Sequence, residues 1–382
     1  MSSTTTTEEL TIDNMFVVDA DAHIMEKDED LIPYMKESFP GIVKHIENAS
    51  NTSNEVRSKI YPLPNSGGTY NANATTDSET GAMTSDTKVR ADADTKLSEM
   101  NNFGIDTAIV TATMLLSLNT TTNPQVGVAY AHAYNEFVRN EVLNRHEGIK
   151  GAALVSRFEP DKGAEEIDDM AQEDDVVAVF IPNAGLNPPF GDTKYDPIYQ
   201  AAQDNDLPIL LHPSSSSFGI DFPMSYQFSH TYSEARIVSQ PWRCMWDLTT
   251  SLTRGLPERF PDLDIVIQEA GIAWIPYMLW RIDDTYLEHP ADMPLLDKLP
   301  SKYIEDRYYF STQPLGHTTG ANLATAIKLL GPESVMFSSD LPHGAFDSPP
   351  EILKLLKPHF DEDTLRAIMG ETARDVFGLK GN

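Results

Sequence analysis

The chain has 382 residues, enough to bury a large core, and its 58 acidic and 28 basic residues give a formal net charge of -30 at pH 7. A surface this negative repels phosphates, so nucleic acids and anionic membranes are excluded as partners. The single cysteine, Cys244, excludes an intramolecular disulfide, and no apolar run approaches the roughly 20 residues that a membrane span needs.

The acidic residues are spread along the whole chain instead of being gathered in one tail. Such a surface suits a protein that stays soluble at high salt, where ions screen the repulsion between like charges. We therefore expect a halophilic host. The first residues, MSSTTTTEEL, have neither the basic nor the apolar region of a signal peptide, so we expect a cytoplasmic protein.

Two polar regions are expected to lie outside the folded core. Residues 1–13 are rich in threonine and are predicted to form a disordered N-terminal tail. Residues 48–87 are rich in Asn, Ser, Thr and Gly and contain few large apolar side chains. This composition predicts a long polar insertion after the first strand, either disordered or acting as a lid. We expect residues 14–382 to form a single domain around it.

Short apolar segments rich in β-branched residues alternate along the chain with segments of helical periodicity. The predicted strands are 16–23, 105–113, 149–156, 176–183, 207–214, 263–271, 306–313 and 334–343. The predicted helices between them include 128–144, 163–172, 195–206 and 348–357. Several strand segments are nearly continuous apolar runs, which is typical of parallel strands buried on both faces. The pattern predicts an α/β fold, a (β/α)8 TIM barrel, with a doubly wound open sheet as the alternative.

Carboxylate and imidazole side chains follow the predicted strands at the points where the strands end. They are Asp21, His23 and Glu26 after the first strand, His212 after the fifth, Glu269 after the sixth, and Asp340 and His343 after the eighth. Because all strands of such a barrel end at one mouth, we expect these groups to converge. Imidazole and carboxylate are ligands of Zn²⁺, Mn²⁺ and Fe²⁺. In the D-x-H motif, Asp21 and His23 point to the same side of an extended segment and can reach one ion.

The order of these motifs resembles the amidohydrolase-related barrel enzymes typified by aminocarboxymuconate-semialdehyde decarboxylase and the aromatic-acid decarboxylases. The matching stretches are DADAHIME, LLHPSS, ERFPDLDIVIQEAGIAWIPYMLWRID, YYFSTQ and FSSDLPH. The resemblance covers roughly residues 15–378 apart from the insertion. It implies a TIM barrel of the metal-dependent hydrolase superfamily type, and a homodimer.

The resemblance implies that Asp21, His23, His212 and Asp340 bind one divalent metal ion per chain. The family's commonest first motif is H-x-H, and Asp21 takes its first place here, which makes the ligand set harder. We expect Zn²⁺, and the harder ligand set leaves Mn²⁺ or Mg²⁺ open as alternatives. The fourth predicted strand, 176–183, contains no lysine of the kind that bridges two ions in other branches of the superfamily, which favours a single ion.

Catalysis at such an ion requires a group that transfers a proton. Asp340 is expected to do so, with Glu269 and His343 as further candidates. Family members often carry His-Gly-Gly after the sixth strand, where the imidazole transfers a proton, whereas this chain has Glu269-Ala270-Gly271. Either Glu269 inherits that role or the proton comes from elsewhere. Glu26 is either an acid in the first turn of a helix or a support for the ligands.

An acidic protein needs cationic groups to hold an acidic substrate. Arg236 and Arg243, which follow the fifth strand, are expected to bind the substrate, and His230 of the same region could reach the pocket. A surface position is the alternative for His230. His317, just after the seventh strand, is a further candidate.

These residues and the resemblance imply a metal-dependent carboxy-lyase, a decarboxylase acting on a small cyclic or unsaturated carboxylic acid. The same ligands serve a hydrolase that attacks a lactone, ester or amide with metal-activated water, and the sequence leaves this alternative open. A non-catalytic ligand-binding barrel is the second alternative. Against it stands the cost of burying so many charged groups without a bound ion.

Overall fold

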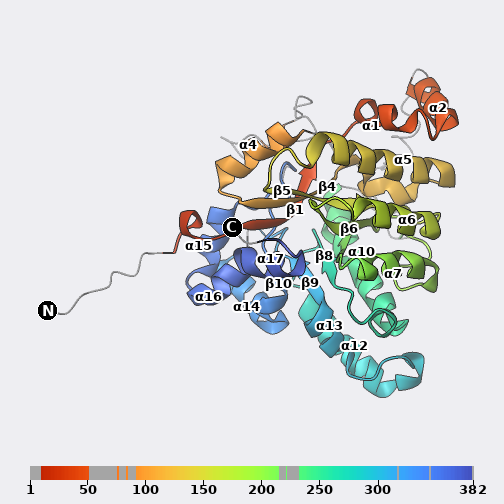
Figure 1. The fold of residues 1–382 in the computed structure, drawn as a ribbon. Helices are drawn as coiled ribbons and strands as arrows, with labels where there is room; N and C mark the ends of the chain where they lie inside the picture. The colour runs from red at the N-terminus through yellow and green to blue at the C-terminus, as the bar shows by residue number, and fades with distance from the viewer. Residues whose placement is uncertain are drawn as a thin grey trace.

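The computed structural model describes residues 10–50, 75–76, 83–84, 92–214, 221, 232–315, 318–343 and 346–380. Eight parallel strands form one sheet in the order β1-β4-β5-β6-β7-β8-β9-β10, which is their order along the chain (Figure 1). The strands are β1 (Val18–Ile24), β4 (Thr107–Ala112), β5 (Ile149–Leu154), β6 (Val176–Pro182), β7 (Ile209–His212), β8 (Ile265–Ile267), β9 (Tyr308–Ser311) and β10 (Val335–Met336). Seven lie within predicted strands and β1 ends one residue beyond its predicted range, so all eight predicted strands are confirmed.

Backbone hydrogen bonds connect the first strand to the segment that follows the last one. The amide of Ala20 donates to the carbonyl of Phe337 at 3.0 Å, and the amide of Asp340 donates to the carbonyl of Asp21 at 2.9 Å. The amide of His23 donates to the carbonyl of Leu341 at 2.8 Å. These bonds close the sheet into a barrel. The prediction of a (β/α)8 barrel is confirmed, and the open doubly wound sheet is wrong.

The strands are buried on both faces, as their apolar sequences predict. Every residue of β1, β4 and β6 is buried. Side chains that point inward fill the barrel, and those that point outward pack against the surrounding helices. Strand β1 also contains three buried polar residues, Asp19, Asp21 and His23. Each of them is at most 1% exposed.

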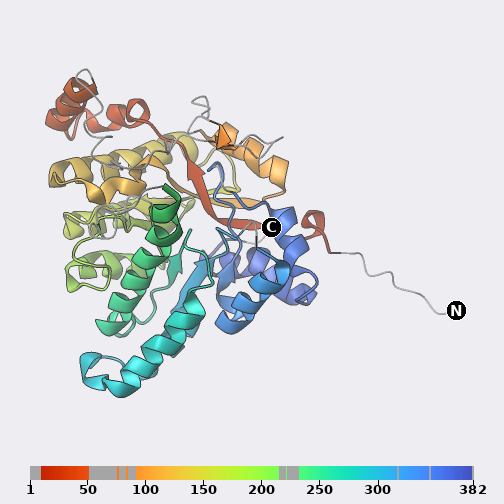
Figure 2. The ribbon, with the colours of Figure 1, turned by 180° about the vertical axis from the view of Figure 1, so that it is seen from behind.

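Helices surround the barrel on its outside (Figure 2). They are α1 (Asp28–Met35), α2 (Pro40–Ser50), α4 (Ala93–Phe103), α5 (Pro124–Phe137), α6 (Pro160–Met170), α7 (Asp196–Asp204), α10 (Tyr232–Thr253), α11 (Leu256–Arg259), α12 (Ile275–Glu288), α13 (Pro300–Arg307), α14 (Gly320–Leu330), α15 (Pro349–Leu356), α16 (Glu362–Arg366) and α17 (Thr372–Val376). The four predicted helices correspond to α5, α6, α7 and α15. Several begin with proline in the first turn, where no backbone hydrogen bond is lost.

The predicted tail and insertion fall mostly outside the described residues. Residues 1–9 of the tail are outside them, whereas Leu10 is buried and Ile12–Asn14 form a short 3₁₀ helix. Residues 48–50 belong to the end of α2. Two short antiparallel strands, β2 (Thr75–Thr76) and β3 (Met83–Thr84), are the remaining described part of the insertion. No helix in the described ranges has the length and apolarity needed to cross a bilayer.

Candidate metal centre

Strand β1 places two of the predicted ligands side by side. Asp21 and His23 are two residues apart in the strand, so their side chains point to the same side, and both are fully buried. The Nε2 atom of His23 lies 3.5 Å from Oδ1 of Asp21. The D-x-H motif therefore presents an imidazole nitrogen and a carboxylate oxygen to one point.

The other two predicted ligands reach the same point from β7 and from the segment after β10. His212 is the last residue of β7, and its Nε2 atom lies 3.5 Å from Oδ1 of Asp21. Oδ1 of Asp340 lies 3.2 Å from Nε2 of His23. The structure thus brings Asp21, His23, His212 and Asp340 together in the barrel mouth, although they are up to 319 positions apart in the sequence, from 21 to 340.

Four buried atoms of this group have no hydrogen-bond partner within the described part of the chain. They are Oδ1 and Oδ2 of Asp21, Nε2 of His23 and Nε2 of His212. An unsatisfied buried polar atom costs about 1–3 kcal/mol, and more when it is charged, so four of them in one place call for a bound group. A divalent cation satisfies nitrogen and oxygen lone pairs together. The residues present therefore fit a metal ion.

The opposite edge of each imidazole is anchored to the backbone. Nδ1 of His23 lies 3.1 Å from the carbonyl of Ala112 and 3.0 Å from the hydroxyl of Thr111, and Nδ1 of His212 lies 2.6 Å from the carbonyl of Pro213. A carbonyl only accepts hydrogen bonds, so each Nδ1 carries the proton and each Nε2 presents its lone pair to the centre. This is the tautomer that a metal ligand requires.

Burial and neighbouring charges shift the pKa values of His23 and His212 in opposite directions. Burial lowers the pKa of His23 to about 4, so this ring is neutral at pH 7. Burial also opposes the charged form of His212, but the carboxylates around it, Asp21 first, outweigh burial and raise its pKa to about 9. Without an ion, Nε2 of His212 therefore carries a proton at pH 7, and a bound cation would take the place of that proton. Burial favours neutral Asp340 as well, yet the neighbouring His343 and His23 hold its pKa well below its usual range. The centre thus contains ionised carboxylate that attracts a cation.

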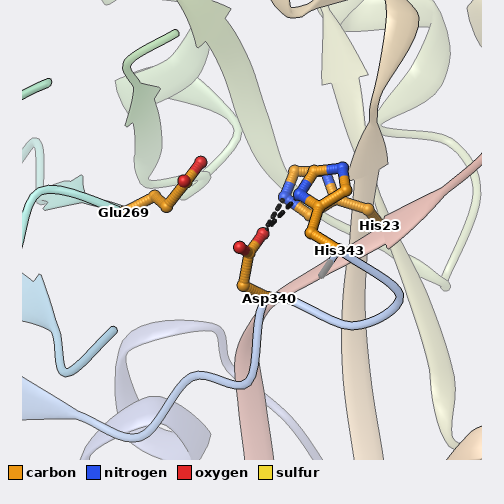
Figure 3. A group of neighbouring side chains, drawn as sticks. All are labelled: His23, Glu269, Asp340 and His343. Carbon is orange, nitrogen blue, oxygen red and sulfur yellow. Dashed lines mark hydrogen bonds and ion pairs between the residues drawn. The ribbon is translucent and has the colours of Figure 1, made fainter. Parts of the chain in front are cut away.

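Glu269 and His343 complete the cluster (Figure 3). Oε2 of Glu269 lies 3.5 Å from Nε2 of His212, and Nδ1 of His343 lies 2.6 Å from Oδ1 of Asp340. Atoms of His23, Glu269, Asp340 and His343 lie within 4.8 Å of one another, so Glu269 and His343 could also ligate an ion. All six strand-end residues predicted to bind metal or transfer protons therefore meet in one place.

The backbone turns sharply at both acids that follow the later strands. Glu269 has φ 41° and Asp340 has φ 64°, in the left-handed region that residues with a side chain rarely adopt. Such conformations carry a cost of order 1–3 kcal/mol, and they are retained where the surrounding structure requires them. Here they direct the two carboxylates into the barrel mouth.

Several residues that contact the cluster were missed by the sequence analysis. Nε2 of Gln240 donates to Glu269 at 2.5 Å, and Nε2 of Gln313 donates to Oδ2 of Asp340 at 3.2 Å. Gln313 follows β9, so the rule of polar residues at strand ends could have found it. Gln240 lies inside α10, where no sequence signal distinguishes it from an ordinary helical glutamine.

Asp19 was also missed, although it lies in the D-A-D-A-H segment. Its carboxylate accepts hydrogen bonds from the amide and the hydroxyl of Ser339, at 2.8 and 2.5 Å, and from the amide of Asp21 at 3.2 Å. It therefore connects the ligand of β1 to the residue preceding Asp340. Burial raises the pKa of Asp19 to about 7.

Glu26 is buried and supports the barrel mouth. Its carboxylate accepts hydrogen bonds from the amides of Thr113 and Leu115, at 3.0 and 2.9 Å. The hydroxyl of Thr113 in turn lies 3.1 Å from Nε2 of His343. Burial raises the pKa of Glu26 to about 7. Of its two predicted alternatives, the contacts favour a supporting position.

The predicted substrate-binding residues are placed differently. Arg243 is 3% exposed, and its guanidinium contacts Asp247, Asp221 and the carbonyl of Leu186, none of which belongs to the cluster. Arg243 is therefore held in internal ion pairs with acids outside the metal-ligand cluster, and the structure does not place it at the predicted metal ligands. His230 and His317 lie outside the described residues, as does the side chain of Arg236.

Comparison with known proteins identifies the family. The family model described as Amidohydrolase matches residues 18–379, nearly the whole chain. The chain belongs to the amidohydrolase family. The resemblance predicted from the motifs is confirmed, and the protein is an enzyme of the amidohydrolase superfamily.

Similar amidohydrolases include decarboxylases. Decarboxylase orsB from Emericella nidulans is 25% identical over 236 residues, which cover 59% of this chain and 68% of that protein. Amidohydrolase map2389c from Mycobacterium avium subsp. paratuberculosis has a TM-score of 0.74 and 17% identity, with 96% of this chain and 100% of that chain covered. These similarities agree with the barrel described above.

A third relative carries a metal. The 5-carboxyvanillate decarboxylase from Novosphingobium aromaticivorans, solved with manganese and 4-hydroxy-3-methoxy-5-nitrobenzoic acid, has a TM-score of 0.69 and 16% identity. The alignment covers 97% of this chain and 100% of that chain. At this identity the likeness concerns the fold.

Proposed function

We propose that this amidohydrolase is a decarboxylase that releases carbon dioxide, without oxidation, from a small cyclic or unsaturated carboxylic acid. The observation that carries the proposal is the convergence, beside Asp340, of buried atoms of Asp21, His23 and His212 that have no hydrogen-bond partner in the described part of the chain. The decarboxylases among its relatives support this reaction over hydrolysis. An aromatic acid is the substrate class that the Novosphingobium complex favours.

Asp21, His23, His212 and Asp340 would hold one divalent ion per chain. When bound, the ion supplies positive charge that holds the substrate's carboxylate and an adjacent oxygen while negative charge develops. Two imidazoles and two carboxylates suit Zn²⁺, and equally Mn²⁺, which the Novosphingobium enzyme contains. The absence of lysine in β6 supports one ion instead of two.

Replacing the carboxylate of the substrate by hydrogen requires one proton at the carbon that loses carbon dioxide. Asp340 and His343 share a hydrogen bond of 2.6 Å, so a proton can pass between them and on to the substrate. Glu269, held by Gln240, faces the same space from the other side of the mouth and is the second candidate for this transfer (Figure 3). Asp340, Glu269 and His343 are thus the proposed catalytic residues, and Arg236 and His230 the proposed cations for the substrate's carboxylate.

Product analysis with the metal-loaded enzyme tests the reaction. We expect carbon dioxide to be released from one or more members of a panel of hydroxybenzoates and related acids. Hydrolysis of a lactone, ester or amide panel with no release of carbon dioxide would establish the hydrolase instead. The non-catalytic alternative predicts a different outcome. The protein would bind these acids and transform none of them, and His212→Ala would change neither its stability nor its metal content.

Metal analysis separates the roles of the acids. We expect close to one equivalent of metal per chain, lost in His212→Ala. Glu269→Gln should retain the metal and lose turnover by about 10²–10⁴-fold if Glu269 transfers the proton. If metal is lost together with turnover in this variant, Glu269 is a ligand and the proton comes from the pair Asp340 and His343.

A further inference from the structure

Among the described residues, Arg157 differs from the other arginines in having no carboxylate partner. Each of the other arginine side chains that the structure describes lies within 3.5 Å of a carboxylate oxygen. Such pairing is expected in a chain with 58 acidic and 28 basic residues. No carboxylate in the same part of the chain pairs with Arg157, and Glu159, two positions further on, pairs with Lys162 at 2.6 Å.

Backbone carbonyls hold the guanidinium of Arg157 instead. Nε donates to the carbonyl of Asn119 at 2.8 Å, and Nη1 donates to the carbonyl of Asn187 at 2.9 Å. Nη2 lies 3.5 Å from the carbonyl of Thr121, and Cζ lies 4.1 Å from the ring centroid of Phe158. A guanidinium has five N–H groups, so these three contacts leave one N–H on each terminal nitrogen without a partner among the described residues. The group is thus fixed in place and keeps two donors for a ligand.

These contacts place Arg157 at the rim of the barrel mouth. Arg157 follows β5, Asn119 lies in the segment after β4, and Asn187 follows β6. All three segments leave the carboxyl ends of their strands, which together form the mouth. Nδ2 of Asn119 also donates to the carbonyl of Pro182, the residue of β6 that pairs with His212 of β7. Asn119 is buried and Asn187 is exposed, so the guanidinium extends from the barrel towards solvent.

A second cation lies close to this guanidinium. Lys194 is exposed, pairs with no carboxylate of the described ranges, and has its ammonium 5.6 Å from the ring centroid of Tyr195. Burial and the charge of Arg157 both lower the pKa of Lys194, and burial lowers the pKa of Arg157 as well. Two neighbouring cations of this kind are stabilised by an anion that contacts both of them.

We propose that Arg157 and Lys194 bind a carboxylate at the rim of the mouth, where an acidic substrate is held on its way to the metal centre. The site itself is argued from the contacts above, whereas the substrate as its ligand rests on the proposed function. The two remaining N–H groups of Arg157 suit the two oxygens of a carboxylate, and Lys194 adds a point charge. In a chain of net charge -30, such a site offsets the repulsion of an incoming acid.

The charges around the site favour a ligand with a single negative charge. The neighbouring Asp192 pairs with Arg254 at 2.5 Å, and the neighbouring Asp221 pairs with Arg243 at 3.1 Å. Arg243 also pairs with Asp247 at 2.8 Å. The region therefore contains four positive and three negative groups, namely Arg157, Lys194, Arg243 and Arg254 against Asp192, Asp221 and Asp247. One carboxylate neutralises the difference of one charge, whereas a phosphate dianion would leave an excess of negative charge.

Titration of the full-length chain with benzoate, followed by the NMR signal of the Nε–H group of Arg157, tests the proposal. The protein is loaded with Zn²⁺, which is diamagnetic. Nε donates to the carbonyl of the buried Asn119, so its proton is protected from exchange with water. The signal is identified by its loss in Arg157→Lys and, without any variant, by magnetisation transfer from the ring of Phe158. We expect a saturable shift of this signal.

A lysine variant and its control show whether the shift reports the proposed site. In Lys194→Met the dissociation constant of benzoate should rise about 2–5-fold, the value of one exposed charge pair. Lys194 makes none of the contacts that hold Arg157, so this variant leaves the rim intact. Lys328→Met is the matched control, because Lys328 is also exposed and lies 5.0 Å from the ring centroid of Phe360. This variant should bind benzoate as the wild type does.

Four results would overturn the proposal. The first two are a signal that benzoate does not shift in a saturable way, and an unchanged dissociation constant in Lys194→Met, which would mean that the shift is transmitted from benzoate at the metal centre. The third is an equal loss of affinity in the Lys328→Met control. The fourth is tighter binding of inorganic phosphate than of benzoate, which would assign the site to an inorganic anion. Benzoate binding requires no turnover, so these results leave the proposed reaction to be judged by product analysis alone.

Discussion

Nδ1 of His343 lies 2.6 Å from Oδ1 of Asp340, the carboxylate that enters the cluster from the last strand of the barrel. The other nitrogen of the same ring, Nε2, lies 3.1 Å from the hydroxyl of Thr113 at the end of β4. The ring also stacks on His23 with centroids 4.2 Å apart. His343 thus joins the segment after β10 to the segment after β4, across β1, and its position fixes the orientation of Asp340.

Substitution of His343 separates positioning from proton transfer. We expect His343→Ala to lower turnover about 10–100-fold, because the partner of a ligating carboxylate is lost. The amide nitrogen of asparagine can take the place of Nδ1, so His343→Asn should recover much of the activity if the ring only positions Asp340. If both variants lose the same amount of turnover while their metal content equals that of the wild type, the imidazole itself transfers the proton.

Asp19 is expected to set metal affinity without touching the ion. Asp19→Ala removes the acceptor for the amides of Asp21 and Ser339, which frees the segments carrying two ligands. We expect metal affinity about 10–100-fold weaker, measured by competition with a chromophoric chelator. Asp19→Asn keeps one carbonyl oxygen and should lose less. Wild-type affinity in the alanine variant would mean that the strands hold Asp21 and Asp340 unaided.

Glu26 is expected to make stability depend on pH. Burial raises its pKa from 4.5 to about 7 in the folded protein, so the folded state binds this proton more tightly than the unfolded state. Its contribution to the free energy of unfolding is therefore full below about pH 4.5 and falls as pH rises towards 7, by about 3 kcal/mol in total.

Urea unfolding of the wild type and Glu26→Gln between pH 5 and 8, at one salt concentration, measures this contribution. The other acids contribute equally to both proteins, so the difference in their free energies of unfolding reports on Glu26 alone. As pH rises, the wild type should lose stability relative to the glutamine variant. A difference that stays constant over this range would mean that Glu26 titrates near its ordinary pKa in the folded protein.

Salt should stabilise the fold. The screening length falls from about 10 Å at 0.1 M salt to about 3 Å at 1 M, which weakens repulsion within a chain of net charge -30. We expect the melting temperature to rise by about 5 °C or more between 0.1 and 2 M KCl. KCl is preferred to sulfate, which stabilises proteins by exclusion from their surface. Full stability at low salt, or precipitation at molar KCl, would contradict a halophilic adaptation.

The barrel and its strand-end residues could be read from the sequence because both depend on local periodicity. Apolar runs of the length of β4, β5 and β6 cannot avoid burial on both faces, and each run marks a strand. In a parallel barrel every strand ends at the same mouth, so naming the polar residues at the ends of β1, β7, β8 and β10 was enough to bring Asp21, His212, Glu269 and Asp340 together.

Only the tertiary structure decided which partners these residues have. Arg243 was expected at the substrate, but Asp247, one helical turn along α10, and Asp221 surround its guanidinium, because a buried arginine is stable only when it is paired. Gln240 reaches Glu269 from a helix interior, and Asp19 reaches Ser339 across 320 positions. Periodicity records which face of an element a side chain occupies, whereas contacts between distant elements depend on how those faces pack, which one chain's sequence does not state.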